Sequence, residues 1–158
     1  MAHNNYYLDL TAETYVVHDG AVLLRLHEKY KMWIAPGGHI DAGEDANEAA
    51  LRELFEEAGV RAMLIGPADW QQEDTANNRD LVPPIYLNRH RISDTHEHSS
   101  FVFAAVTDSR ELAPQPGEHP DAELRWVNRE ELLDMKNNDD RLQPETYRYA
   151  LKALDLVG

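Results

Sequence analysis

The chain of 158 residues contains no cysteine, so disulfides, thiolate metal sites and cysteine nucleophiles are excluded. It also has no apolar run long enough to cross a bilayer, and its first ten residues show neither the basic start nor the apolar stretch of a signal peptide. We therefore expect a cytoplasmic protein with no membrane partner, since a cysteine-free chain fits a reducing compartment. The length is that of one domain, and we expect residues 1–158 to form it.

Basic residues are scarce: 15 lysines and arginines stand against 29 aspartates and glutamates, which gives a formal net charge of −14. An acidic surface repels nucleic acid and anionic membranes, so no DNA partner is expected. Such a protein can still act on phosphates if metal cations bridge the negative groups. For most of the acidic side chains, maintaining solubility is a sufficient explanation.

Strands are expected on both sides of one central helix. The dipeptide Asp19-Gly20 is a strong hairpin signal between strands at residues 14–18 and 21–27. A short strand in KMWIA follows and runs into a turn at the letters PGG. The remaining expected elements are an apolar run at 62–65, strands at 85–92, 99–107 and 124–127, and helices at 129–135 and 144–156. This order predicts an α/β fold in which helices cover both faces of a mixed sheet.

The clearest helix signal covers residues 46–58. Asp45 can cap its N-terminus, Glu48 three residues later completes a capping box, and Gly59 ends the helix. Apolar side chains gather on one side of this helix and explain how it docks against a core. They do not explain the opposite side, which is acidic.

Three glutamates, Glu53, Glu56 and Glu57, stand at positions i, i+3 and i+4 of this helix, so their carboxylates converge. Like charges at such a short distance destabilise one another unless a cation lies between them. A bare E-x-x-E-E on an exposed helix is most often a solvated face. Carboxylate oxygens in this arrangement also suit Mg²⁺ or Mn²⁺, which keep several waters that a substrate phosphate can replace. The surrounding motif decides between these two interpretations.

The segment GGHIDAGEDANEAALRELFEEAGV contains Gly38, five residues, Glu44, seven residues and then the run RELFEEAGV. This spacing resembles the complete signature of the Nudix hydrolase family, of the MutT-like kind. The resemblance implies an α/β/α sandwich with a mixed sheet, Mg²⁺ or Mn²⁺ as cofactor, and a small-molecule nucleotide as substrate. The implied reaction is attack of water at phosphorus, which splits a nucleoside diphosphate linked to a group X into a nucleoside monophosphate and phosphate-X.

The resemblance also implies roles for individual residues of the motif. Glu53, Glu56 and Glu57 would bind the metal, and the carbonyl of Gly38 would supply a further oxygen. Family members differ on whether the residue at Glu53 binds metal or takes the proton of the attacking water. His39 follows the glycine and could contact a substrate phosphate, although an exposed histidine without such a role is the more common case.

Other residues of the motif are expected to support its structure. Arg52 and Glu44 would form an ion pair that orients the helix and the preceding turn. Gly37, Gly38 and Gly43 are expected to let the backbone adopt turn conformations that larger residues avoid.

A further carboxylate beyond the motif is common among relatives, and the candidate here is Glu97. It lies between His96 and His98 just before an apolar strand, where alternation would point the two histidines to one side and Glu97 to the other. Glu97 is either a late metal ligand or base, or an incidental carboxylate of a polar loop. Glu118, with His119, is a rival in the proline-rich loop.

One alternative function is a catalytically silent Nudix module that binds nucleotides or RNA. Such modules usually lose glutamates of the motif, which this chain retains, and an acidic chain is a poor RNA platform. The sequence carries no convincing signal for a particular nucleotide derivative. It also leaves the oligomeric state open, with a homodimer, common among relatives, as one alternative.

Overall fold

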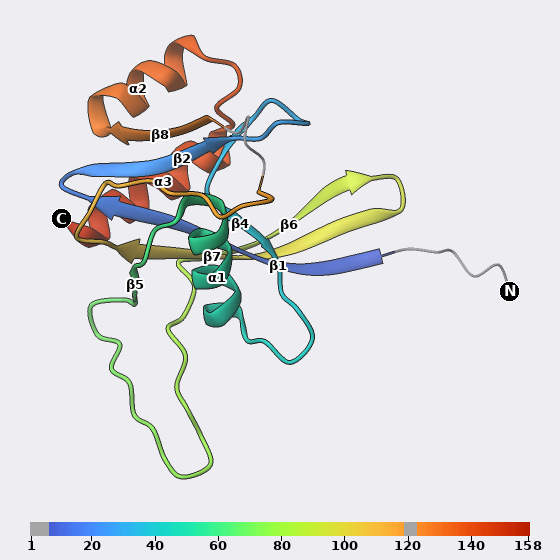
Figure 1. The fold of residues 1–158 in the computed structure, drawn as a ribbon, viewed down its shortest axis with the longest axis vertical. Coiled ribbons are helices and arrows are strands. Elements are labelled where there is room, and N and C mark those ends of the chain that lie inside the picture. The colour runs from blue at the N-terminus through green and yellow to red at the C-terminus, as the bar shows by residue number, and fades with distance from the viewer. Residues whose placement is uncertain (1–6, 119–122) are drawn as a thin grey trace, which may run out of the picture.

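The computed structural model describes residues 7–118 and 123–158 (Figure 1). In chain order the elements are β1 (Tyr7–His18), β2 (Ala21–Leu26), β3 (Trp33–Ile34), β4 (Gly37–His39), α1 (Ala46–Ala58), β5 (Met63–Ile65), β6 (Tyr86–Ser93), β7 (His96–Val106), β8 (Glu123–Asn128), α2 (Arg129–Asn138) and α3 (Pro144–Val157). None of the helices in these two ranges is both long and apolar enough to span a bilayer.

The strands form one mixed sheet, as the sequence predicted. Its main path runs β3-β2-β1-β7-β5, while β4 pairs with β1, β6 with β7 and β8 with β2. The central pair is parallel: β1 and β7 run side by side from Tyr7 opposite His96 to Val17 opposite Val106. The other pairings are antiparallel. This pair places Asp9 opposite His98 and Leu8 opposite Glu97.

Helices cover both faces of the sheet, so the expected α/β/α sandwich is confirmed (Figure 1). On one face, Leu54 and its neighbours on α1 pack against Val16 and Phe103 of the two central strands. On the other face, Leu132 of α2 and Tyr149 of α3 belong to a second apolar core. These residues are almost completely buried, so burial of apolar surface holds both layers in place.

The predicted hairpin is confirmed, but the strand before it is longer than expected. Asp19 and Gly20 adopt positive φ angles of 47° and 72°, as a two-residue hairpin turn requires. Strand β1 begins at Tyr7 rather than at residue 14. Apolar and polar residues alternate from Leu8 to Glu13, a strand signal that the sequence reasoning did not use. In the fold this half of β1 pairs with β7 and β4, which are distant in the sequence.

The expectation of a turn at Gly37 and Gly38 was wrong, because both residues lie in strand β4. Neither belongs to the glycines with positive φ, whereas Gly43 does, at 84°. Glycine is needed in β4 for space. A Cβ on Gly37 would lie 2.4 Å from the carbonyl oxygen of Ala12, and one on Gly38 would lie 2.4 Å from a carboxylate oxygen of Glu53.

Candidate active site

Helix α1 is fixed at both ends and in its middle. The side chain of Asp45 accepts a hydrogen bond from the backbone of Glu48, the reciprocal bond completes the predicted capping box, and Gly59 ends the helix in the left-handed conformation. The buried Thr14 hydroxyl of β1 donates to the carbonyl oxygen of Ala50 at 3.1 Å. The glutamates of α1 are therefore held on a rigid support.

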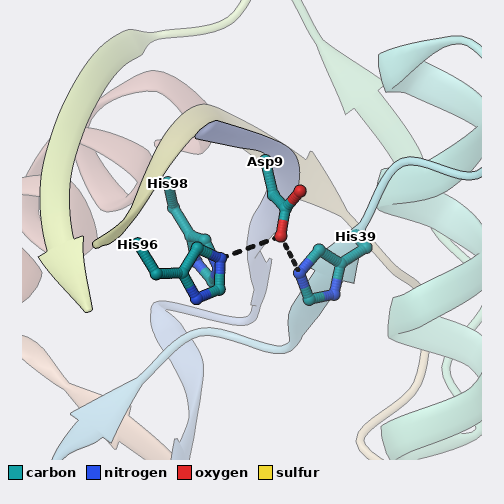
Figure 2. Close-up of side chains that lie close together, drawn as sticks. All are labelled: Asp9, His39, His96 and His98. Carbon is teal, nitrogen blue, oxygen red and sulfur yellow. Dashed lines mark hydrogen bonds and ion pairs between the residues drawn. The ribbon is translucent and has the colours of Figure 1, made fainter. Parts of the chain in front are cut away.

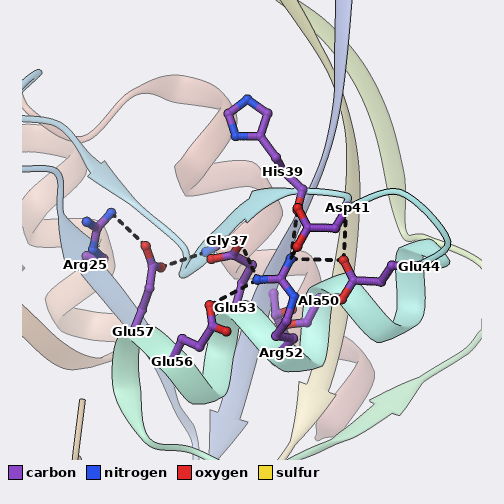
Figure 3. A network of polar contacts seen from close by, with 11 residues as sticks. Arg25, Gly37, His39, Asp41, Glu44, Ala50, Arg52, Glu53, Glu56 and Glu57 are labelled. Atoms are coloured by element: carbon purple, nitrogen blue, oxygen red, sulfur yellow. Dashed lines mark hydrogen bonds and ion pairs between the residues drawn. The ribbon is translucent and has the colours of Figure 1, made fainter. Parts of the chain in front are cut away.

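Arg52 connects most of the acidic side chains of the motif (Figure 3). Its guanidinium forms a two-pronged ion pair with Glu44, at 2.7 and 3.0 Å, as expected. A third nitrogen, Nη1, donates to Glu53 at 2.9 Å and to Glu56 at 3.0 Å. Nη2 also donates to the carbonyl oxygen of His39 at 3.0 Å. The hydrogen bonds from Arg52 hold the pKa of Glu44 below its usual range.

Glu57 turns away from Arg52 and towards the sheet (Figure 3). Its Oε2 accepts from the backbone nitrogen of Gly37 at 2.9 Å, and its Oε1 lies 3.5 Å from Nη1 of the buried Arg25. The side chain is only 9% exposed. Burial raises the pKa of Glu57 to about 7, although Arg25 and the Gly37 nitrogen act in the opposite direction. A cation beside this carboxylate would favour its ionised form.

Glu53 lies against the backbone of Gly38. Its carboxylate occupies the space that a Cβ on Gly38 would fill, so no larger residue fits there without moving it. Burial raises the pKa of Glu53, and the hydrogen bond from Arg52 opposes that shift. Glu53, Glu56 and Glu57 are called the carboxylate cluster below. Their oxygens are the hard ligands that Mg²⁺ and Mn²⁺ prefer, so the residues present fit such an ion.

A cavity of about 1010 Å³ opens beside the carboxylate cluster. Glu53, Glu57 and Gly38 line it, and the partly buried Glu13 of β1 lies on its wall. Loss of hydration raises the pKa of Glu13 to about 7, with a further contribution from the charge of Glu145 and an opposing one from the Ser100 hydroxyl. The cavity therefore has an acidic wall.

Of the two late carboxylates expected from the sequence, Glu118 lines this cavity, whereas Glu97 does not line it and is paired with Arg89. Glu118 lines the cavity, and its charge contributes to the raised pKa of both Glu53 and Glu57. Glu97 on β7 accepts a hydrogen bond from Nε of Arg89 at 2.8 Å and contacts a second nitrogen of the same guanidinium. It is not among the residues that line the cavity. His119 lies outside the described residues.

A second polar group was missed by the sequence reasoning. Asp9, His39, His96 and His98 each bring a nitrogen or carboxylate oxygen within 4.8 Å of the others (Figure 2). We call these four residues the imidazole cluster. The expected alternation did point His96 and His98 to one side of β7, with ring centroids 4.8 Å apart. Asp9 was missed because its place depends on the parallel pairing of β1 with β7.

Comparison with known proteins agrees with the resemblance of the motif to the Nudix signature. A family model described as "NUDIX domain" matches residues 13–149. A protein named RNA pyrophosphohydrolase from Bartonella clarridgeiae is 35% identical over 107 residues, which cover 65% of this chain and 60% of that protein. One of the same name from Dinoroseobacter shibae is 31% identical over 128 residues, which cover 75% of this chain and 76% of that protein. The chain thus spans less than two thirds of the length of the Bartonella relative.

Solved structures show the same fold. A NUDIX-family hydrolase from Clostridium perfringens is 33% identical, with a TM-score of 0.79 over 95% of this chain and 98% of that one. A MutT NUDIX hydrolase from Burkholderia pseudomallei is 21% identical, with a TM-score of 0.57 over 96% and 99% of the two chains. The second match bears on the fold alone.

Proposed function

The chain belongs to the NUDIX domain family, and we propose that it is a divalent-metal-dependent pyrophosphohydrolase. Its substrate would be a nucleoside diphosphate linked to a further group, either a nucleoside triphosphate or another nucleotide derivative. The observation that supports this best is the carboxylate cluster, because all its members are held on one rigid helix beside a cavity large enough for a nucleotide.

The cation would be Mg²⁺ or Mn²⁺, held by Glu53, Glu56 and Glu57 with the carbonyl oxygen of Gly38. The absence of a side chain at Gly38 supports this assignment, since it lets the backbone approach the Glu53 carboxylate. Divalent cations bound there would neutralise the phosphate oxygens that otherwise repel an attacking water. Arg52 would hold the helix and the Glu44 turn in register with the substrate.

The chain also offers groups that can take the proton of the attacking water. Glu53 is one candidate, since burial moves its pKa towards the neutral range in which a general base is effective. Glu118 is the other. We propose Glu118 rather than Glu97 as the late carboxylate, because it lines the cavity and is electrostatically coupled to Glu53 and Glu57.

Two facts bear on the substrate class: one favours RNA, and the other disfavours a long RNA chain. The curated relatives named above are RNA pyrophosphohydrolases, which suggests a 5′-triphosphorylated RNA end. The net charge of −14 disfavours a long polyanion, because broad contacts to its backbone would be repulsive. A short 5′-triphosphorylated RNA end is compatible with both facts, whereas a free nucleotide is compatible only with the second.

A substrate panel tests the proposal directly. Purified protein is incubated with nucleoside triphosphates, nucleotide sugars, dinucleoside polyphosphates, and capped and 5′-triphosphorylated RNA oligonucleotides, with Mg²⁺ or Mn²⁺. Released phosphate is measured after addition of a phosphatase or pyrophosphatase. We expect turnover of at least one compound and its loss on chelation.

Two variants separate this activity from that of a contaminant. Glu57→Gln should lower turnover more than about 100-fold. Loss of a group that only hydrogen-bonds to a metal ligand already lowers metal affinity or activity about 10–100-fold. The matched control is Glu130→Gln, the same change at an exposed position of α2, which should turn over as the unmodified protein does. Binding of a panel compound without hydrolysis would instead indicate a silent binding module.

A further inference from the structure

The imidazole cluster joins four side chains from three strands (Figure 2). Asp9 comes from β1, His39 ends β4, and His96 and His98 lie on β7. Oδ2 of Asp9 lies 2.8 Å from Nε2 of His96 and 3.4 Å from Nε2 of His39. The rings of His39 and His98 are 5.1 Å apart between centroids. The donor set is three imidazoles and one carboxylate.

Backbone pairing holds these residues in position. In the parallel ladder Asp9 is opposite His98, and in the antiparallel ladder His39 is opposite Thr11, two residues beyond Asp9. His96 and His98 share one side of β7 because successive side chains of a strand alternate. The group is therefore built on hydrogen-bonded strands rather than on loops, which is the kind of support that a preorganised site requires.

One member of the group has an unsatisfied nitrogen. Nε2 of His98 is buried and has no hydrogen-bond partner within residues 7–118 and 123–158. Leaving a buried polar atom unpaired costs stability, and such atoms are rare unless a water, an ion or a function accounts for them.

We propose that Asp9, His39, His96 and His98 form a transition-metal site separate from the carboxylate cluster. Three nitrogens and one oxygen are a tetrahedral ligand set of the kind that holds Zn²⁺, with bonds of about 2.0–2.1 Å. Ligand atoms in such a tetrahedron are about 3.3 Å apart, so the present separations, all within 4.8 Å, would have to shorten by about 1.5 Å at most. Imidazole favours Zn²⁺, Co²⁺ or Ni²⁺ over Mg²⁺.

The site would face the same cavity as the carboxylate cluster. His39 and His98 line that cavity, and His39 directly follows Gly38 in the chain. A cation bound there adds positive charge to an acidic cavity wall, at a point where substrate phosphates beyond the carboxylate cluster can reach it. Metal binding at this site does not depend on the proposed hydrolysis and can be measured in its absence.

Cobalt titration tests the assignment. Tag-free protein is stripped with a chelator and titrated with Co²⁺ while visible absorption is recorded, because tetrahedral cobalt absorbs far more strongly than octahedral cobalt. We expect the strong bands to saturate at one equivalent, to disappear on addition of Zn²⁺, and to persist in excess Mg²⁺. His96→Gln and His98→Gln should each weaken Co²⁺ binding more than about 100-fold, since outer partners of a metal site already contribute 10–100-fold.

Three controls make the outcome decisive. His18→Gln, at the other end of β1, should bind Co²⁺ as the unmodified protein does. Glu57→Gln should keep the cobalt bands although it loses turnover, which separates this proposal from the proposed hydrolysis. Asp9→Asn provides a second probe if His98→Gln fails to fold by circular dichroism, and it should also weaken binding. Absence of tetrahedral bands in the unmodified protein, or their persistence in a His96→Gln/His98→Gln double variant, would overturn the proposal.

Discussion

The carboxylate cluster and the imidazole cluster each contribute residues to the wall of one cavity, but they are built in opposite ways. Figures 2 and 3 show the two clusters. The three glutamates come from a single helix and are spaced by its period, so they are neighbours in the sequence. The imidazole cluster comes from strands that are far apart in the chain and meet only through sheet pairing. One cluster can be recognised as a motif, whereas the other exists only in the folded protein.

The two clusters also differ in how their charge is balanced. Arg52 contacts Glu53 and Glu56, and Arg25 lies beside Glu57, so every member of the carboxylate cluster has a guanidinium within 3.5 Å. In the imidazole cluster the only carboxylate is Asp9, and one nitrogen of His98 has no partner in the described part of the chain. The first cluster is stabilised without a metal, while the second retains an unpaired donor or acceptor.

Outside the glutamates of the carboxylate cluster, the largest expected effect on turnover comes from Gly38→Ala. Its Cβ would lie 2.4 Å from the Glu53 carboxylate, the mobile end of a side chain, so Glu53 should move while the fold persists. Turnover should fall about 100-fold, as a displacement near 1 Å can produce, with little change in melting temperature. The cobalt bands of the imidazole cluster should remain, which tests whether the two clusters are independent.

The neighbouring substitution Gly37→Ala is the matched comparison. Its Cβ would lie 2.4 Å from the backbone oxygen of Ala12, which cannot rotate away, so β4 must separate from β1. The free energy of unfolding should fall by about 1–3 kcal/mol, as overpacking does. Equal melting temperatures for the two variants would contradict the distinction between backbone and side-chain crowding.

A further expected effect concerns the pH dependence of the free energy of unfolding. It distinguishes Glu57, which is proposed to bind metal, from Glu13, which is not. Burial raises the pKa of both Glu57 and Glu13 to about 7, so the folded protein binds their protons more tightly than the unfolded chain does. Stability should therefore decrease as pH rises from the unfolded value of 4.5 towards 7. Glu13→Gln should remove on the order of 3 kcal/mol of this pH dependence, because each pKa unit is worth about 1.4 kcal/mol.

Denaturant unfolding between pH 4.5 and 8 measures this slope, with and without Mg²⁺. Saturating Mg²⁺ should abolish the share that belongs to Glu57, because a bound cation favours the ionised carboxylate. The part of the slope that comes from Glu13 should persist in the presence of Mg²⁺ and should be lost in the Glu13→Gln variant. A slope that Mg²⁺ leaves unchanged in both proteins would remove Glu57 from the metal site.

The smallest expected effect concerns the two late carboxylates. Glu118→Gln should lower turnover by about tenfold, below the range of about 10²–10⁴ for a full general base, because Glu53 can share that role. Glu97→Gln loses an ion pair with Arg89, and Glu97 itself does not line the cavity, so turnover should change less than about threefold, since partly exposed pairs contribute little. Initial rates at saturating substrate decide between them, and the reverse order would restore Glu97 as the late carboxylate.

Local signals in the sequence identified much of this molecule. The hairpin at Asp19-Gly20 depends on backbone preferences of two residues, and α1 depends on caps that lie within one turn of its ends. The ion pair of Arg52 with Glu44 follows from a motif of fixed spacing. Such features need no knowledge of which strands pair.

Features that depend on distant pairing were missed for a physical reason. Gly37 and Gly38 were interpreted as a turn because their strand conformation depends on the pairing of β4 with β1, which no local pattern shows. The first half of β1 is a different case, since the alternation of apolar and polar residues from Leu8 to Glu13 is a local strand signal. Asp9 and His39 are separated by 30 positions in the chain yet lie on adjacent strands. No pattern in either local segment specifies the other.

The contact of Arg52 with Glu53 and Glu56 has a consequence for how the carboxylate cluster would take up an ion. Under the proposed function, loading would be an exchange rather than an addition, because Nη1 would give up its hydrogen bonds to Glu53 and Glu56. The two hydrogen bonds from Arg52 to Glu44 would not have to break. In the metal-free protein Arg52 holds these carboxylates in place, and it would compete with an incoming ion for their oxygens. The strength of its hydrogen bonds would set the free metal concentration that is needed to displace it.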